Sequence, residues 1–293
     1  MKKITGVIPA FISPFTENGI DTNAAQAHAK RLVEKGATGL YVGGSTGEMI
    51  FMSVSERKTL LEAVVDAVPK DFPIIAHVGA ANPADAFDMA KHADKAGAAA
   101  ISSVAPFYYK YTYAEIKKYY QKLSGSISIP TIVYNVPNLS GAALSGGQLG
   151  ELMNMENVSG MKFTSSDYYT FERLRSAFPD KALYNGCDEM LCAGLAMGAD
   201  GGIGTTYNIM IDKFVKIYEL FGKGMVKEAF AVQNGVNDVV EQLFKYSLLP
   251  AVKYLVKLTG CDCGVCREPF LPLTEDEEKA LAASVKGKLS WDI

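Results

Sequence analysis

The stretch VSGMKFTSS, residues 158–166, combines a strand-like apolar run with a single lysine. Successive side chains of a β-strand point to opposite faces, so Lys162 would face away from Met161 and Phe163. Burial lowers the pKa of a lysine, and its neutral amine can then attack a carbonyl group. The alternative is a lysine at a strand end whose ammonium group reaches water.

Similar apolar runs recur along the chain and alternate with helical patterns. Eight of them qualify as strands: residues 4–10, 39–44, 73–78, 99–104, 130–135, 158–163, 182–186 and 200–205. Their continuous apolar character is typical of parallel strands that are buried on both faces. Helical patterns follow at residues 23–34, 55–68, 84–96, 113–123, 145–153, 168–177, 189–197 and 213–222. This alternation predicts an α/β fold, a (β/α)8 TIM barrel, and no G-x-G-x-x-G motif follows the first strand.

The strand pattern stops near Gly222, and helical patterns continue at residues 226–244, 248–258 and 275–283. We therefore expect residues 1–222 to form the barrel with the active site, and residues 223–293 to form a C-terminal helical region packed on it. The joining segment CDCGVCREPFLPL is too rich in Cys, Gly and Pro to be helical. The helix at 55–68 should begin at Ser55 without a full capping box, because Lys58 stands three places on.

The composition is ordinary for a globular chain, with 293 residues, 48% hydrophobic and 21% charged, and a net charge of −3. This charge disfavours a surface for nucleic acid or anionic membranes. No run reaches the ~18 apolar residues of a membrane span. Two prolines interrupt the apolar N-terminal stretch, which we interpret as a strand rather than a signal peptide.

The five cysteines are an odd number and indicate a reducing compartment, so we expect a cytoplasmic protein. Cys261, Cys263 and Cys266 lie close together in the run CDCGVC. A structural zinc site needs four ligands, and the three histidines are scattered, so we expect no metal site.

Polar residues gather where the predicted strands end, and this is where the active site of a (β/α)8 barrel lies. The GGSTGE turn, residues 43–48, contains Gly44, Ser45 and Thr46. Its N–H groups and hydroxyls can hold a carboxylate, although a plain glycine-rich turn is the alternative. Tyr134 can pass a proton if its hydroxyl faces the barrel mouth, or it can be hydrogen-bonded at the core edge.

Other strand ends carry further candidates. They are Tyr108, Gly186, Asp188, Glu189, Gly204 and Thr205. An aromatic cluster such as the one around Tyr108 more often serves packing. Asp188 and Glu189 can cap a helix or accept hydrogen bonds from a polyhydroxy substrate. No Lys or Arg lies between Lys181 and Lys213, so we expect a ligand that carries hydroxyl groups rather than phosphate.

Together the strand ends predict the making or breaking of a carbon–carbon bond. Lys162 would form an imine with a 2-oxo acid whose carboxylate rests on Ser45 and Thr46. The protonated imine is an electron sink, so the bond one carbon further on can break or form. Tyr134 would move the proton on or off the aldehyde oxygen, and no metal or organic cofactor is needed.

These residues closely resemble the dihydrodipicolinate synthase/N-acetylneuraminate lyase family, from the run GVIPA at 6–10 to REPF at 267–270. The resemblance implies a homotetramer of barrels and a covalent pyruvate imine. It implies that Lys162 is the Schiff-base lysine, Tyr134 the catalytic tyrosine, and Ser45 and Thr46 the carboxylate pair. It also implies that Tyr108, which lies between Phe107 and Tyr109, is a catalytic tyrosine that reaches a neighbouring subunit's site.

The rim favours the lyase branch of this family. Synthases usually have an arginine near Asn138 and Leu139 that holds a second carboxylate, and none is present here. A serine is common at the position of Thr205, which keeps the hydroxyl. The resemblance implies these substrate-binding residues: Gly44, Ser45, Thr46, Thr164, Gly186, Asp188, Glu189, Gly204 and Thr205.

The implied reaction is the reversible cleavage of N-acetylneuraminate to N-acetylmannosamine and pyruvate. The expected partners are therefore these small molecules and further copies of the chain, with no nucleic acid or membrane. Two alternatives stay open. One is another pyruvate-dependent aldolase, acting on a sugar acid or making dihydrodipicolinate. The other is a barrel without catalytic activity.

Overall fold

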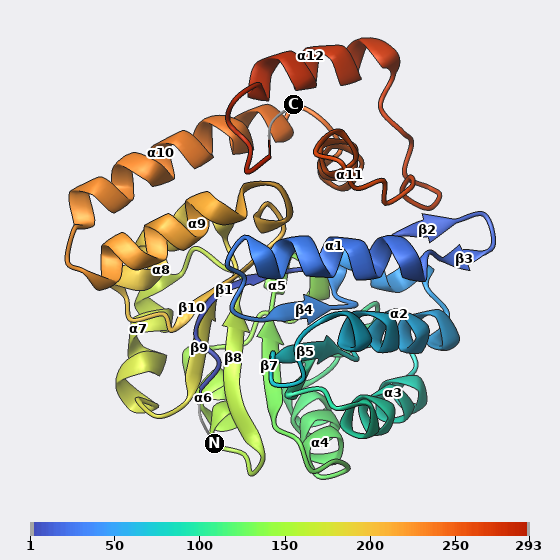
Figure 1. The fold of residues 1–293 in the computed structure, drawn as a ribbon. Helices are drawn as coiled ribbons and strands as arrows, with labels where there is room; N and C mark the ends of the chain where they lie inside the picture. The colour runs from blue at the N-terminus through green and yellow to red at the C-terminus, as the bar shows by residue number, and fades with distance from the viewer. Residues whose placement is uncertain (1–2, 292–293) are drawn as a thin grey trace.

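Eight parallel strands form a closed barrel in the computed structural model, which describes residues 3–291 (Figure 1). The strands are β1 (Gly6–Pro9), β4 (Leu40–Val42), β5 (Ile74–His77), β6 (Ala100–Val104), β7 (Thr131–Asn135), β8 (Val158–Phe163), β9 (Ala182–Asn185) and β10 (Gly201–Gly204). Hydrogen bonds join them in the order β1, β10, β9, β8, β7, β6, β5, β4, and a bridge between Ala10 and Tyr41 closes the ring. The predicted (β/α)8 barrel is confirmed, with every predicted strand found.

Helices surround this barrel and also form most of the C-terminal part. They are α1 (Thr22–Glu34), α2 (Val54–Ala67), α3 (Pro83–Ala96), α4 (Tyr113–Ser124), α5 (Pro137–Ser140), α6 (Gly146–Met153), α7 (Tyr168–Ala177), α8 (Leu191–Ala196), α9 (Tyr207–Gly222), α10 (Val226–Leu243), α11 (Leu248–Leu258) and α12 (Glu275–Val285). Helices α10 and α11 pack on α9, and α12 packs on both of them at the top of Figure 1.

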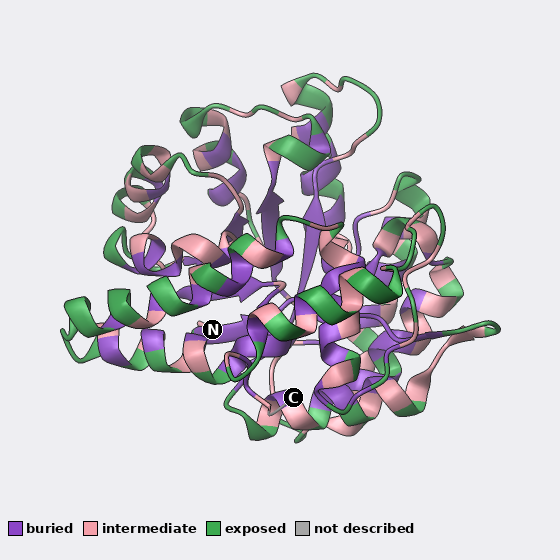
Figure 2. Ribbon diagram, turned by 90° about the horizontal axis from the view of Figure 1, so that it is seen from above, coloured by how far each residue is buried: buried purple, intermediate pink, exposed green. Residues whose placement is uncertain are grey.

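The alternation of side chains along the strands separates two cores. Outward-facing residues such as Met161 and Phe163 pack in the layer between the strands and the helices. Inward-facing residues fill the barrel with a second, smaller cluster that includes Ile8, Tyr41 and Tyr184. Seen from above, the strands are buried at the centre while the helices expose one face (Figure 2). Lys162 therefore projects into the barrel, as the alternation predicted.

Helix α2 begins earlier than the sequence pattern suggested. Ser53 Oγ accepts a hydrogen bond from the Glu56 N–H at 3.2 Å, and the Glu56 carboxylate accepts one from the Ser53 N–H at 2.8 Å. The expected start at Ser55 without a capping box was wrong, because Ser53 and Glu56 have the spacing of a complete box.

Three features were not predicted. They are the hairpin of β2 (Phe15–Thr16) and β3 (Gly19–Ile20), the short helix α5, and the first turns of α9. Residues 207–211 are buried throughout, so they show no amphipathic pattern that would mark the start of α9.

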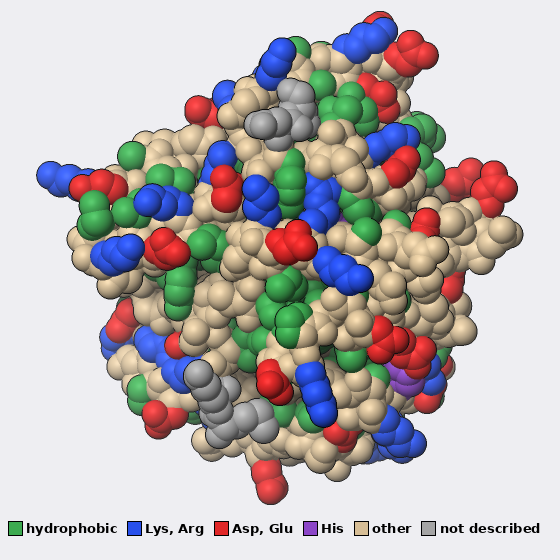
Figure 3. Space-filling model, viewed as in Figure 1, with side chains coloured by type: hydrophobic (Ala, Val, Ile, Leu, Met, Phe, Trp, Pro, Cys, Tyr) green, Lys and Arg blue, Asp and Glu red, His purple; other side chains and the backbone are tan. Residues whose placement is uncertain are grey.

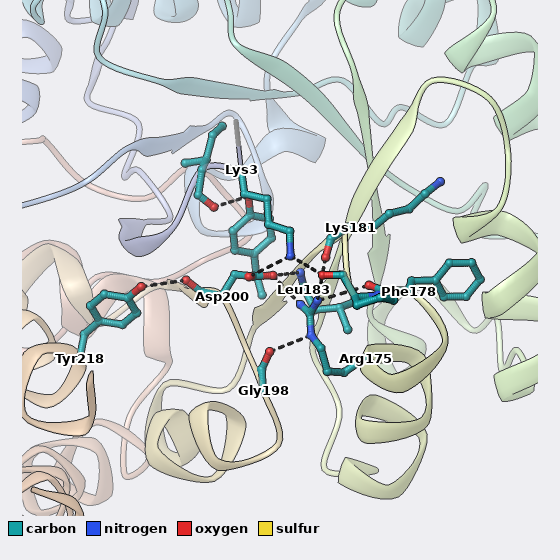
Figure 4. Close-up of polar contacts among 11 residues, drawn as sticks. Lys3, Arg175, Phe178, Lys181, Leu183, Gly198, Asp200 and Tyr218 are labelled. Atoms are coloured by element: carbon teal, nitrogen blue, oxygen red, sulfur yellow. Dashed lines mark hydrogen bonds and ion pairs between the residues drawn. The ribbon is translucent and has the colours of Figure 1, made fainter. Parts of the chain in front are cut away.

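An ionic network ties the amino ends of the strands together (Figure 4). The Asp200 carboxylate, just before β10, accepts hydrogen bonds from Arg175, Lys3 and the Leu183 N–H. The Arg175 guanidinium also donates to the carbonyls of Gly198, at 2.9 Å, and of the turn after α7. The charged groups at this end of the barrel therefore bind one another and nearby main-chain groups.

The outer surface carries charges of both signs. On the face shown in Figure 3, lysines and arginines lie among aspartates and glutamates, without a field of one sign. None of the helices within residues 3–291 has the length and apolar character needed to cross a membrane.

Candidate active site

A cavity of about 370 Å³ opens at the carboxyl ends of the strands. It brings together residues that are far apart in the sequence. The predicted site residues on its wall are Ser45, Thr46, Tyr134, Lys162, Thr164, Gly186, Asp188, Glu189 and Thr205. Gly44 and Gly204 lie beside the wall, and Tyr108 does not contribute to it in this single chain.

Lys162 lies at the floor of the cavity with 5% of its surface exposed. Its partners in the sheet register are Tyr134 on β7 and Tyr184 on β9. The Nζ atom lies 4.4 Å from the centroid of the Tyr134 ring and 4.6 Å from that of Tyr41. Within residues 3–291 no carboxylate lies at ion-pair distance from this amine. A buried amine without an anionic partner is suited to act as a nucleophile.

The GGSTGE turn forms one wall of the cavity next to Lys162. Residues Ser45–Gly47 make a short 3-10 helix, η1, whose first N–H groups have no partner within the helix. The Thr46 and Thr205 hydroxyls are 2.6 Å apart, which joins this turn to the end of β10. A Cβ at Gly44 would lie 2.6 Å from the Tyr41 ring, so only glycine permits this approach.

Two buried side chains that the sequence analysis did not select support this turn from below. The Arg57 guanidinium donates to the carbonyls of Gly79, at 2.7 Å, and of Gly43, at 3.2 Å. His77 Nε2 accepts a hydrogen bond from the Val104 N–H at 3.2 Å. Burial, followed by the charge of Arg57, lowers the pKa of His77, so this imidazole is neutral.

The position of Arg57 offered a signal that could have revealed it. It falls on the same stripe of α2 as Leu60, Leu61 and Val64, where a charged residue is unexpected. The His77 ring lies 6.0 Å from the Tyr134 ring in an edge-to-face arrangement, so it also helps to orient that tyrosine.

Asp188 forms a polar part of the cavity wall after β9. Its Oδ2 accepts hydrogen bonds from the N–H and the hydroxyl of Thr206, both at 2.7 Å. Burial raises the pKa of the Asp188 carboxyl to about 6, although the bonds from Thr206 act in the opposite direction. A Cβ at Gly204 would lie 2.1 Å from Oδ1, so glycine leaves room for this oxygen. Oδ1 is therefore the carboxylate oxygen best placed to meet a ligand.

The C-terminal helices complete the cavity, which the sequence analysis did not foresee. Gln233 Nε2 on α10 donates to the Asp188 carbonyl, and Asn237 Nδ2 donates to the Glu189 carbonyl, both at 3.1 Å. Apolar side chains from the same region also line the wall: Val240, Phe244, Leu248 and Leu249. These residues follow ordinary helical periodicity, so the sequence does not distinguish them from core residues.

Tyr108 lies on the loop after β6 and is 86% exposed. Its φ is 80°, a left-handed conformation that non-glycine residues seldom adopt. Its ring meets that of Tyr109 edge-to-face at 5.0 Å, while the neighbouring Phe107 packs on the cluster that contains Tyr134. A catalytic role for Tyr108 in a neighbouring subunit stays a prediction.

Cys261 and Cys263 are buried with their sulfur atoms 4.0 Å apart. Over residues 3–291, His, Cys, Asp and Glu side chains nowhere gather in threes with a geometry suited to a metal ion. The role of the CDCGVC run must therefore be sought in its contacts.

Residues 3–288 match the sequence pattern of the dihydrodipicolinate synthetase family. The chain belongs to this family. It is 40% identical over 291 residues to the N-acetylneuraminate lyase of Rhizobium meliloti, covering 99% of this chain and 97% of that protein.

Solved structures of family members have the same fold. CdNal from Clostridium difficile in complex with mannosamine superposes with a TM-score of 0.93 at 34% identity, covering 97% of this chain and 98% of that one. The N-acetylneuraminate lyase of Fusobacterium nucleatum complexed with pyruvate superposes with a TM-score of 0.90 at 34% identity, covering 96% of each chain.

Proposed function

We propose that this protein is a class I aldolase that reversibly cleaves N-acetylneuraminate to N-acetylmannosamine and pyruvate. The observation that carries this proposal is the position of Lys162, buried between the GGSTGE turn and Tyr134 at the floor of a polar cavity. Relatives that align over nearly the whole chain are N-acetylneuraminate lyases, which supports the choice of substrate.

The first step would be attack of the Lys162 amine on the keto carbon of the open-chain sugar acid. Loss of water leaves a protonated imine, and the substrate carboxylate rests on the hydroxyls and N–H groups of Ser45 and Thr46. The cavity supplies no other cation, since Lys162 is the one Lys or Arg on the described wall. The positive imine and the carboxylate then balance each other's charge.

The second step would be cleavage of the bond between C3 and C4. Tyr134 gives its phenolic proton to the hydroxyl that leaves as water in the first step, and the resulting phenolate accepts the proton of the C4 hydroxyl. The bonding electrons then move to the imine nitrogen, and the aldehyde leaves. The enamine that remains takes a proton at C3, and water releases pyruvate and restores the amine. The hydroxyls of the departing sugar would be bound by residues that line the cavity wall, namely Asp188, Glu189, Thr164 and Thr205.

The rim of the cavity disfavours the alternative reaction, the synthase condensation of pyruvate with aspartate semialdehyde. Asn138 and Leu139 lie on the wall at the place where synthases usually have an arginine. Neither side chain can neutralise a second carboxylate, which supports a polyhydroxy aldehyde over aspartate semialdehyde as the partner of pyruvate. The homotetramer and the cytoplasmic location remain predictions from the resemblance and the cysteine content.

The test compares two assays on the same preparation. Pyruvate release from N-acetylneuraminate is measured beside condensation of pyruvate with aspartate semialdehyde. Release from the sialic acid alone is expected. Activity only in the condensation would overturn the substrate assignment, and failure to trap a pyruvate adduct with borohydride would overturn the imine mechanism.

A further inference from the structure

We propose that Glu48 is a positioning residue that holds the GGSTGE turn in the shape that receives the substrate carboxylate. It acts through a clasp, the Glu48 clasp, formed by Glu48 with Lys253, Val265 and Arg267 of the C-terminal region. The inference rests on the proposed pyruvate imine, and it assigns a role to the CDCGVC run.

Glu48 has an unusual backbone for a residue with a large side chain. Its φ and ψ are 57° and 41°, the left-handed conformation, at the junction between η1 and the next 3-10 helix, η2 (Met49–Phe51). This conformation is unfavourable for residues other than glycine, so it persists only where surrounding contacts impose it. Glu48 follows Thr46 by two residues, and its N–H donates to the Ser45 carbonyl at 3.0 Å. A shift of Glu48 would therefore move the two residues proposed to bind the carboxylate.

The contacts that impose this conformation come from the Glu48 carboxylate. Oε1 accepts a hydrogen bond from Lys253 Nζ at 2.8 Å, and Oε2 accepts one from the Arg267 N–H at 2.8 Å. The Lys253 ammonium also donates to the Val265 carbonyl at 3.0 Å and lies 4.2 Å from the centre of the Phe15 ring. Both charged side chains are only 2% exposed. A buried pair of this kind is a weak source of net stability but strongly restricts geometry, which is the property of a positioning device.

The CDCGVC run brings the main-chain partners of the clasp into place. The Phe15 N–H donates to the Cys263 carbonyl at 3.1 Å. Gly264 has a φ of 69°, and a Cβ there would lie 2.2 Å from the Phe15 carbonyl oxygen. The chain can thus pass closely beside Phe15 and present the Val265 carbonyl and the Arg267 N–H to the buried pair. Gly264 of the run permits this close approach.

The substitution Glu48→Gln tests the proposal with almost no change in shape. Lys253 and the Arg267 N–H bind different oxygens of the carboxylate. In glutamine an NH2 group, which donates, replaces one of these oxygens, so one of the two donors loses its acceptor. The readout is the half-saturating pyruvate concentration for the adduct trapped by borohydride, followed by mass spectrometry. We expect this concentration to rise about tenfold or more, while the trapping rate at saturating pyruvate stays within about threefold of wild type.

A matched control is Glu56→Gln. Glu56 lies on α2, outside the GGSTGE turn, and its carboxylate accepts a hydrogen bond from the Arg267 guanidinium. The substitution Glu56→Gln should leave the half-saturating pyruvate concentration within about twofold of wild type. The wild-type protein tests the imine mechanism itself. If it forms no adduct, the proposed function fails, whereas the positioning role is tested only by the difference between the variants and the wild type.

A folded Glu48→Gln protein with the wild-type pyruvate dependence would overturn the positioning role, as would an equal change in Glu56→Gln. If Glu48→Gln does not fold, the double variant Glu48→Gln, Lys253→Met removes both buried charges together. It must show the same rise in the pyruvate concentration, and an unchanged value would again overturn the proposal.

Discussion

The charged groups at the floor of the cavity differ in their pairing from those at the amino ends of the strands. At the amino ends of the strands, the Asp200 carboxylate binds Lys3, Arg175 and a main-chain N–H (Figure 4). At the carboxyl ends, Lys162 has no ion pair within the described chain, and burial raises the pKa of Asp188. Charged groups that bind one another contribute stability, whereas an amine without an ion-pair partner and a carboxyl with a raised pKa beside a cavity are available to a ligand.

The largest expected effect comes from Lys162→Ala. It should abolish the borohydride-trapped pyruvate adduct and lower pyruvate release from N-acetylneuraminate by at least about a thousandfold, because the nucleophile is gone. Both are measured on the purified variant. An adduct that still forms would mean that a different lysine is the nucleophile.

Lys181 is the matched control from the other end of the sheet. Its Nζ donates to the carbonyls of Met153 and of Val158, the latter at 2.7 Å. Lys181→Ala should keep the adduct and instead lower the free energy of unfolding by about 1–2 kcal/mol, because these acceptors lose their donor. An equal loss of adduct in Lys162→Ala and Lys181→Ala would contradict the assignment of different roles to the lysines at the two ends of the barrel.

Tyr134→Phe should have the next largest effect. Tyr134 and Tyr184 flank Lys162 in the sheet, but the Tyr184 hydroxyl donates to the Ile4 carbonyl at 2.9 Å, towards the amino end. We expect Tyr134→Phe to lower kcat about 100-fold to 1000-fold, because the proton carrier is lost. Tyr184→Phe should leave kcat nearly unchanged and cost about 1 kcal/mol of unfolding free energy. Steady-state kinetics and urea unfolding of both variants distinguish these outcomes.

We expect a smaller, pH-dependent effect on substrate binding from the Asp188 carboxyl. This carboxyl has a pKa of about 6 in the folded protein, so it loses acceptor capacity as the pH falls below that value. The KM for N-acetylneuraminate should therefore rise below about pH 6 in the wild type. Asp188→Asn should lower kcat/KM about tenfold to 100-fold, flatten this pH dependence and keep the pyruvate adduct. Equal loss of adduct and turnover would indicate a structural role.

The raised pKa of the Asp188 carboxyl should also make the free energy of unfolding depend on pH. This pKa is raised from 3.8 to about 6 on folding, so the folded state binds more protons than the unfolded state between these values. The contribution of Asp188 to the free energy of unfolding should fall as the pH rises through this window and stay constant above it. Urea unfolding of wild type and Asp188→Asn from pH 4 to pH 7 isolates this contribution, because the substituted amide does not titrate.

The strands and the inward-facing Lys162 could be predicted because each depends on a local pattern, a short apolar run with alternation. The wall formed by α10 and α11 could not. Phe244 and Leu248 follow the same helical periodicity as core residues, and which cavity they face depends on long-range packing. The contacts of the Arg57 and Glu48 side chains were not predicted for a related reason. The groups that these side chains bind lie 14 or more residues away in the chain.

The smallest effect on activity is expected at Asp200, although this residue is central to the network at the amino end. Asp200→Asn keeps the shape but removes the charge that Arg175 and Lys3 share. We expect the free energy of unfolding to fall by about 2 kcal/mol, with kcat and KM for N-acetylneuraminate within about twofold of wild type.

Asp88→Asn serves as the control, because Asp88 forms a surface pair with Lys58 that should contribute no measurable stability. A large loss of activity in Asp200→Asn at unchanged stability would contradict the separation of the two ends. It would mean that the closure of the barrel at its amino end fixes the position of Lys162, since β8, β9 and β10 are joined side by side. Equal stability changes in Asp200→Asn and Asp88→Asn would instead show that the network at this end is no stronger than an ordinary surface ion pair.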